Sequence, residues 1–135
     1  MTAAVVTLIS QLQDPKKEVV LIRKGLKASL IEAFLNQEGF LVKDVLERLD
    51  ISASTYFAKK KGQKPLDTYT TEKFIRLIQV MLKASKVLGE KEAKNWLYRP
   101  IPSLGNELPI ELLDTEPGHR LVEQTLLQIE HGVYS

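Results

Sequence analysis

Residues 42–59 read VKDVLERLDISASTYFAK, and this stretch decides the fold. Its apolar spacing predicts two short helices that cross and bury side chains against each other, the pattern of a helix-turn-helix. The inward positions of this pair are Val45, Leu49, Ile51 and Tyr56. Asp50 occupies the tight turn between them, where a residue that tolerates a left-handed backbone is needed.

The second of these helices has the composition of a DNA-recognition helix. Ser52 is a suitable N-cap, and short side chains at this end can enter a major groove and approach base edges. The residues concerned are Ser52, Ala53, Ser54 and Thr55. Four lysines follow and are suited to phosphate contacts; they are Lys59, Lys60, Lys61 and Lys64. The alternative is an ordinary helix pair with a solvated lysine cluster at its loop.

Helical periodicity extends over most of the remaining chain. Further helices are expected at 26–36, 71–88, 109–113 and 116–131, with a shorter one around Trp96. In the helix 71–88, Thr70 is the expected cap. Its expected buried stripe consists of Phe74, Leu77, Ile78, Met81, Leu82 and Val87. The β-branched stretches 5–9 and 19–22 are the only strand candidates, and the Asp14-Pro15 pair between them also suits a helix start. The sequence therefore predicts an all-α protein, a Cro-like helix-turn-helix bundle followed by a small helical lobe.

Charge is distributed unevenly along the chain. Residues 15–89 carry 15 Lys/Arg against 8 Asp/Glu, whereas residues 90–135 carry 4 against 8. A basic part suits a polyanion and an acidic part does not, so the imbalance indicates two different partners, unless it arose by chance. The chain has no cysteine, no long apolar run and no secretory pattern in residues 1–14. We therefore expect a cytoplasmic protein without membrane association.

Nothing in the residue pattern indicates an enzyme. The two histidines, His119 and His131, lie twelve residues apart on one expected helix, too far to share a zinc ion within it. The seven glycines are spread singly, so no loop is suited to hold a phosphate. We expect no catalytic residue, no metal, no cofactor and no small-molecule substrate.

The C-terminal part resembles the toxin-binding domain of the Xre/MbcA/ParS antitoxin family. The matching residues are Ala93, Trp96, Leu97, Leu104, Gly105, Pro109, Leu112, Leu113, Thr115, Gly118, Val122, Leu126, Ile129 and the ending Gly132-Val133-Tyr134-Ser135. The resemblance continues upstream through Arg23-Lys-Gly-Leu26, the helix-turn-helix and residues 84–89, and so covers roughly 15–135. The chain departs from the family pattern at Asn106, which replaces a common second glycine, and at Lys27, which replaces a common proline.

The resemblance implies a division of the chain into three parts. These are an N-terminal extension at 1–14, a DNA-binding domain at 15–89 and a toxin-binding domain at 90–135. It also implies a partner, a RES-domain toxin that depletes cellular NAD and whose pocket is covered by the C-terminal segment. Candidate toxin contacts are Arg99, Arg120, Glu130, His131, Gly132, Val133, Tyr134 and Ser135. A helix-turn-helix commonly reads a two-fold operator, so a homodimer is expected.

Three alternatives remain open at this point. The protein can be a transcription regulator without a toxin partner, whose C-terminal lobe serves self-association. It can also be a toxin-binding module whose helix-turn-helix no longer contacts DNA. The C-terminal segment itself can be a frayed end with Tyr134 packed on its own core, the usual state of terminal residues.

Overall fold

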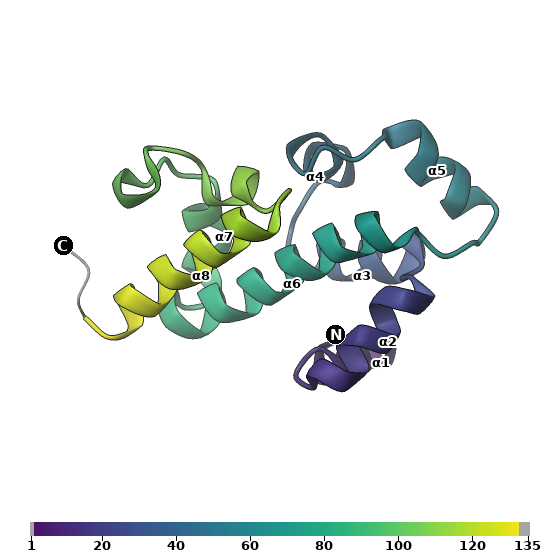
Figure 1. Ribbon diagram of the computed structural model, residues 1–135, viewed down its shortest axis with the longest axis horizontal. Coiled ribbons are helices and arrows are strands. Elements are labelled where there is room, and N and C mark those ends of the chain that lie inside the picture. The colour runs from purple at the N-terminus through teal and green to yellow at the C-terminus, as the bar shows by residue number, and fades with distance from the viewer. Residues whose placement is uncertain (1, 133–135) are drawn as a thin grey trace. The chain divides into compact units, whose positions relative to one another are not determined.

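The computed structural model describes residues 2–132, and these residues are mostly helical (Figure 1). They form eight α-helices and two short 3-10 helices, η1 and η2, and contain no strand. In chain order the elements are α1 Ala3–Gln11, α2 Pro15–Lys24, α3 Ala28–Gln37, α4 Val42–Arg48, α5 Ala53–Lys61, α6 Thr68–Leu88, α7 Glu90–Leu97, η1 Pro102–Leu104, η2 Pro109–Leu112 and α8 Glu116–Glu130. The expected all-α fold is confirmed.

The chain divides into two compact units, unit 1 at Met1–Ile75 and unit 2 at Arg76–Ser135. The division lies inside α6, so unit 1 holds α1 to α5 with the start of α6, and unit 2 holds the remainder. This is a division by contacts. The resemblance implies a functional boundary at another place, after residue 89, and that boundary stays a prediction.

In unit 1, α3 is the helix on which the others pack. It contacts α1, α4 and α5, and its residues Ile31, Phe34 and Leu35 are almost completely buried. Val5 and Leu8 of α1 are buried as well. Residues before 14 therefore contribute to the core that supports the helix-turn-helix.

The two β-branched stretches near the N-terminus are helical. Residues 5–9 lie in α1 and residues 19–22 in α2. The Asp14 side chain accepts a hydrogen bond from the Lys16 backbone N–H at 3.0 Å, and Pro15 occupies the first position of α2. A capping carboxylate and the fixed φ of proline favour a helix start, and together they outweigh the β-branched composition.

The start of α6 differs from the expectation. The helix begins at Thr68 rather than at residue 71, and the capping group is the Asp67 carboxylate, which accepts from the Thr70 N–H at 2.7 Å. Leu82 and Val87 are only half-buried. The two units use different sections of α6, so its buried positions do not follow the single stripe that was expected.

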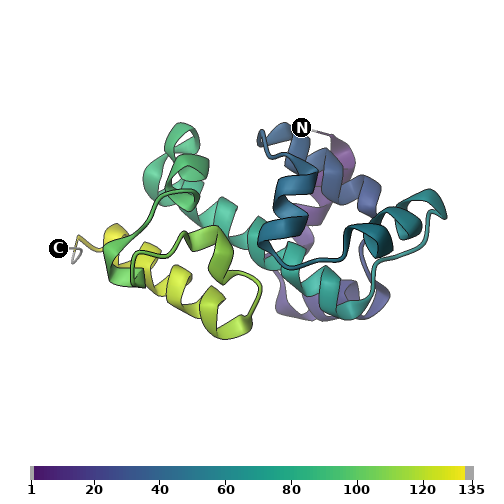
Figure 2. The same cartoon turned by 90° about the horizontal axis from the view of Figure 1, so that it is seen from above.

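Unit 2 packs α8 against irregular chain that carries η1 and η2 (Figure 2). Thr115 caps α8 by accepting from the Gly118 N–H at 3.2 Å. Gly118 is buried, and a Cβ placed there would lie 1.8 Å from the Leu112 carbonyl oxygen. Only a residue without a side chain allows the first turn of α8 to approach η2 this closely.

A buried arginine fixes the same corner of unit 2. Arg76 is 7% exposed, and its guanidinium donates to the backbone oxygens of Leu113 at 2.8 Å and Asp114 at 3.0 Å. These carbonyls lie between η2 and α8, where no helix provides a donor. The hydrogen bonds compensate part of the cost of burying the cation.

We predict that Gly118→Ala destabilises unit 2 by about 1–3 kcal/mol, because α8 must move away from the Leu112 carbonyl. Urea unfolding followed by the fluorescence of Trp96, the single tryptophan of the chain, reports on this unit. Gln124→Ala at an exposed position of the same helix is the matched control and should be nearly neutral. Equal midpoints for the two variants would show that the close approach is unimportant.

Candidate functional site

The turn between α4 and α5 has the backbone that the sequence predicts. Asp50 is left-handed, with φ of 55°, and the next amide, that of Ile51, donates to the Leu46 carbonyl at 2.8 Å. The expected inward residues Val45, Leu49 and Tyr56 are buried, and Ile51 is half-buried. The helix-turn-helix is therefore a packed unit.

The N-terminal end of α5 is open to solvent. Ser52, Ala53, Ser54 and Thr55 are all exposed. Ser52 is the N-cap that the sequence predicts, and its Oγ accepts from the Thr55 N–H at 3.3 Å and lies 3.2 Å from the Ser54 Oγ. The cap uses one acceptor position of the Ser52 hydroxyl. The exposed Thr55 side chain is accessible to an incoming ligand.

The lysine cluster is not uniform. Lys60 Nζ is 2.9 Å from Glu32 Oε1 of α3, in a pair within unit 1. Lys61 and Lys64 are exposed and Lys59 is half-buried. An open groove of about 500 Å³ runs along this side of α5; its lining residues are Ser54, Thr55, Ala58, Lys59, Gly62 and Lys64. Hydroxyls and cations therefore share one face beside the exposed start of α5.

Glu32 connects α3 to the inner side of α5. The Tyr56 hydroxyl donates to Glu32 Oε2 at 2.7 Å, while Lys60 takes the other oxygen. Burial raises the pKa of the Tyr56 phenol, and the Glu32 carboxylate raises it further, so the phenol keeps its proton. The Tyr56 ring packs on Phe57 edge to face at 5.1 Å and on Phe74 at 5.9 Å. The contacts with Glu32 of α3 and Phe74 of α6 hold α5 against the core, whereas Phe57 belongs to α5 itself.

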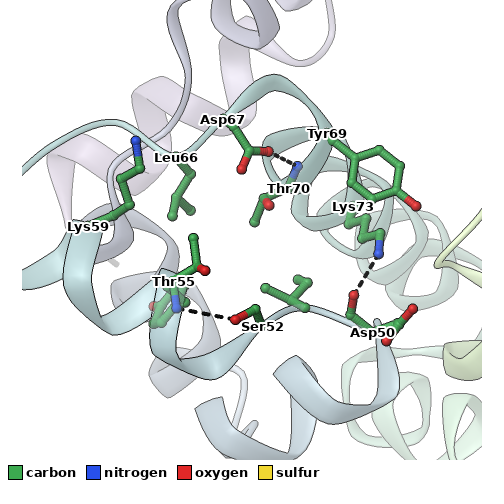
Figure 3. Close-up of a pocket in the computed structure, with 11 residues that line it drawn as sticks. Asp50, Ser52, Thr55, Lys59, Leu66, Asp67, Tyr69, Thr70 and Lys73 are labelled. Carbon is green, nitrogen blue, oxygen red and sulfur yellow. Dashed lines mark hydrogen bonds between the residues drawn. The ribbon is translucent and has the colours of Figure 1, made fainter.

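A buried lysine contacts the helix-turn-helix from α6. Lys73 is 1% exposed, and its ammonium donates to the Asp50 carbonyl at 2.8 Å, next to a cavity of about 240 Å³ (Figure 3). The ammonium also lies 4.4 Å from the centre of the Tyr69 ring. Lys73 is not among the residues expected from the sequence, because lysines usually lie on the surface. Its spacing of four residues from the buried Leu77 was the available signal.

In unit 2, the residues that match the family are mostly structural. Ala93, Leu97, Leu113, Val122 and Leu126 are fully buried. Trp96, Leu104 and Pro109 are buried too, and Leu112 and Ile129 are half-buried. Asn106 has a φ of 63° and Gly105 of 66°, so the turn survives without the second glycine, as expected.

The candidate toxin contacts in unit 2 differ in their pairing: Arg99 and Glu130 each form an ion pair, and Arg120 is exposed. Arg99 pairs with Glu92 at 2.7 Å, with both side chains more than half exposed, and Arg120 is exposed. Glu130 pairs with Lys83 at 3.1 Å, a hydrogen bond that lowers the pKa of its carboxyl group.

The end of α8 carries the last candidate residues that the structure describes. His131 follows α8 directly, and its N–H donates to the Leu127 carbonyl at 3.1 Å. Gly132 then turns the chain with φ of 70°. The remaining candidates, Val133, Tyr134 and Ser135, lie outside the described residues.

Residues 2–132 contain neither a metal-binding cluster nor a membrane-spanning helix. No three His, Cys, Asp or Glu side chains are placed to hold a metal ion. None of the described helices combines the length and apolar character needed to cross a bilayer. His119 has carboxylates for neighbours, Glu123 at 3.1 Å and Glu116 at 3.6 Å.

Comparison with known proteins assigns a family to most of unit 2. Residues 83–132, all within unit 2, match the family described as antitoxin Xre/MbcA/ParS C-terminal toxin-binding domain. This part of the chain is therefore an Xre/MbcA/ParS-type toxin-binding domain by sequence. The match begins in the last part of α6 and ends at the glycine after α8, so it includes the η1–η2 segment that Arg76 holds.

Similarity to individual relatives of the Xre/MbcA/ParS family extends into unit 1. The Prs ADP-ribosylating antitoxin of Sphingobium sp. strain YBL2 is 28% identical over 132 residues, covering 90% of this chain and 83% of that protein. Antitoxin Xre of Photorhabdus laumondii is 29% identical over 117 residues, covering 85% and 79%. Antitoxin Xre of Pseudomonas putida is 30% identical over 83 residues, covering 61% and 52%. Relatives named as antitoxins therefore share most of the chain, helix-turn-helix included.

We predict that Tyr56→Phe lowers the free energy of unfolding by about 1 kcal/mol at neutral pH, the usual worth of one hydrogen bond. The difference from wild type should shrink above pH 10. There, tyrosine in the unfolded chain ionises while folded Tyr56, with its raised pKa, does not, so the wild type loses stability that the variant never had. Urea unfolding by circular dichroism from pH 7 to 11 measures this, with Tyr69→Phe as the exposed control. A constant difference up to pH 11 would contradict the prediction.

Proposed function

We propose that this protein is an Xre/MbcA/ParS-type antitoxin, which represses its own operon through α5 and inactivates a RES-type toxin through unit 2 and the segment after α8. The observation that carries the DNA half is the exposed start of α5, where short polar side chains and lysines lie along one open groove. The toxin half rests on the match of residues 83–132 to a toxin-binding domain.

The DNA half divides into base contacts and phosphate contacts. Exposed hydroxyls of Ser54 and Thr55 can donate to or accept from base edges in a major groove. The ammonium groups of Lys59, Lys61 and Lys64 provide phosphate contacts, which position the protein without reading sequence. Lys60 contributes less, because Glu32 already neutralises it. A two-fold operator would be bound by a homodimer.

The proposed toxin partner follows from the resemblance to the Xre/MbcA/ParS antitoxins, whose partners are commonly RES-domain toxins. RES-domain toxins deplete NAD, and we propose that the segment from Glu130 to Ser135 covers the toxin's NAD pocket. The Sphingobium relative is named an ADP-ribosylating antitoxin, and ADP-ribosylation consumes NAD, so the name connects a similar protein with NAD chemistry. Arg99 and Arg120 lie in unit 2 as further contacts, and the exposed pair between Arg99 and Glu92 costs little to break.

The proposed action is stoichiometric binding in the cytoplasm rather than catalysis. It needs no cofactor, metal or small-molecule substrate. The relatives are named as antitoxins, and inhibition by occlusion requires only that the antitoxin fill the pocket that the substrate would occupy.

We predict that replacing Lys59, Lys61 and Lys64 together with Ala weakens DNA binding and flattens its salt dependence. The slope of log K against log salt should become shallower by about 0.9 for each lysine that contacts a phosphate. Fluorescence anisotropy with a duplex from upstream of the reading frame measures both quantities. Lys91→Ala, at an exposed position of unit 2, is the control.

An unchanged slope in the triple variant would remove the DNA half of the proposal. The protein would then be a toxin-binding module that no longer contacts DNA.

We also predict that ending the chain at His131 abolishes toxin neutralisation and leaves DNA binding intact. The measurement is NAD content in cells that express the neighbouring reading frame alone, with the full chain, or with the shortened chain. NAD should collapse, recover and collapse again in these three strains. A variant with Glu90→Gln, at an exposed position of α7, is the full-length control.

Two other results would change the proposal in different ways. If NAD never falls, the partner is not a NAD-depleting toxin, and a regulator whose C-terminal lobe serves self-association becomes the better account. If NAD recovers with the shortened chain as well, unit 2 neutralises the toxin without the last residues.

A further inference from the structure

Helix α5 is held at two places that differ in chemistry. On the inner side of α5, Tyr56 near the middle of the helix and Lys60 near its C-terminal end both bind Glu32 of α3, at 2.7 and 2.9 Å. At its N-terminal end, α5 follows the left-handed turn at Asp50, whose carbonyl oxygen accepts from Lys73 Nζ at 2.8 Å (Figure 3). The first attachment fixes the inner side of the helix, and the second fixes the end that carries the proposed base-contacting residues.

Lys73 is an unusual residue for its position. It is 1% exposed and lies on α6 among apolar neighbours such as Phe74 and Leu77. A buried ammonium is costly unless it is hydrogen-bonded, so an apolar residue would be the simpler choice for core packing. What Lys73 adds is the hydrogen bond to the Asp50 carbonyl and the contact with the Tyr69 ring at 4.4 Å.

The nearby backbone amides do not donate to the Asp50 carbonyl, because the turn uses them elsewhere. The Asp50 and Ile51 amides donate back to α4, at 3.2 and 2.8 Å, and the Ser52 carbonyl accepts from the Tyr56 amide at 3.0 Å. Lys73 therefore connects the turn to a helix outside the helix-turn-helix pair, at the residue where the chain direction changes.

We propose that Lys73 is a positioning residue for DNA recognition: by holding the Asp50 carbonyl, it sets the orientation of α5 and so of Ser52 to Thr55. This rests on the proposed DNA-binding function. The cavity of about 240 Å³ beside the contact, lined by Ser52, Thr55 and Lys73 among others, has room for water. Without the ammonium, water can satisfy the carbonyl, and the turn can relax while the protein stays folded.

Such a relaxation affects two kinds of DNA contact differently. A hydrogen bond to a base edge needs a donor–acceptor distance of about 2.7–3.2 Å and good alignment, so a small tilt of α5 breaks it. Lysines such as Lys61 and Lys64 reach phosphates on long flexible stems and adapt to the same tilt. Loss of Lys73 should therefore reduce discrimination between sequences more than affinity for DNA in general.

The test uses the full chain with Lys73→Met, which keeps the stem and removes the ammonium. Anisotropy is measured with a duplex from upstream of the reading frame and with a scrambled duplex of the same composition. Affinity for the upstream duplex should fall about tenfold, equivalent to about 1.4 kcal/mol. Affinity for the scrambled duplex should stay within about twofold and the salt slope should not change. Lys91→Met, with the same charge change at an exposed position of unit 2, is the control.

To distinguish a purely structural role of Lys73, the anisotropy is measured at a temperature below the unfolding transition of the variant. Destabilisation alone would then leave both affinities unchanged. Amide hydrogen exchange gives a readout without DNA: residues 50–55 should exchange faster in Lys73→Met and residues 56–61, held through Glu32, should not. If Lys73→Met does not fold, Tyr69→Leu removes the ring from the ammonium and should reduce discrimination about threefold.

The two proposals fail in different ways. If the wild-type protein binds both duplexes equally, the DNA half of the proposed function fails, and the inference fails with it. If the wild type discriminates and Lys73→Met discriminates equally well, or loses both affinities in the same proportion, only the positioning role is overturned. Unchanged exchange at residues 50–55 would overturn it as well.

Discussion

The structure depends on two buried cations of α6 that bind backbone carbonyls. Lys73 donates to the turn of the helix-turn-helix in unit 1, and Arg76 donates to the corner between η2 and α8 in unit 2. All three carbonyl groups, of Asp50, Leu113 and Asp114, lie where helices end or the chain turns, so helical hydrogen bonding offers them no donor. Each cation is nearly inaccessible to water. The charge is tolerated because hydrogen bonds replace much of the lost hydration.

Side-chain hydrogen bonds to the backbone hold segments that have little regular secondary structure. Residues 98–115 of unit 2 contain only η1 and η2 and an isolated bridge between Ile101 and Glu107. Arg76, the buried Gly118 and the Thr115 cap hold this segment against α8. In unit 1, Glu32 performs a comparable task for α5. The two charged side chains that hold these elements in place, Arg76 and Glu32, therefore point into their units and are not on the exposed surface of the candidate sites.

The candidate site was predictable where local chemistry decides it. The turn at Asp50, the cap at Ser52 and the exposed start of α5 follow from residue type and spacing. The difference between Lys60 and the other lysines was not predictable, because it depends on Glu32, which is 28 residues distant in the chain. The start of α6 was misplaced for a related reason: Asp67 and Thr70 are both good caps, and sequence alone does not rank them.

The all-α fold and the helix-turn-helix could be read from the sequence, because apolar periodicity, caps and turn residues act over a few positions. The ordered set of matching residues in the C-terminal part indicated its resemblance to the toxin-binding domain. Only the tertiary structure decided that Lys73 and Arg76 are buried, that Lys60 is paired, and that the contact division lies within α6. Burial and pairing depend on which distant segments meet, and a residue's own neighbours in the chain do not fix that. Helical spacing can place a lysine on a buried face, as it does for Lys73 and Leu77, but it does not show which distant carbonyl that lysine will bind.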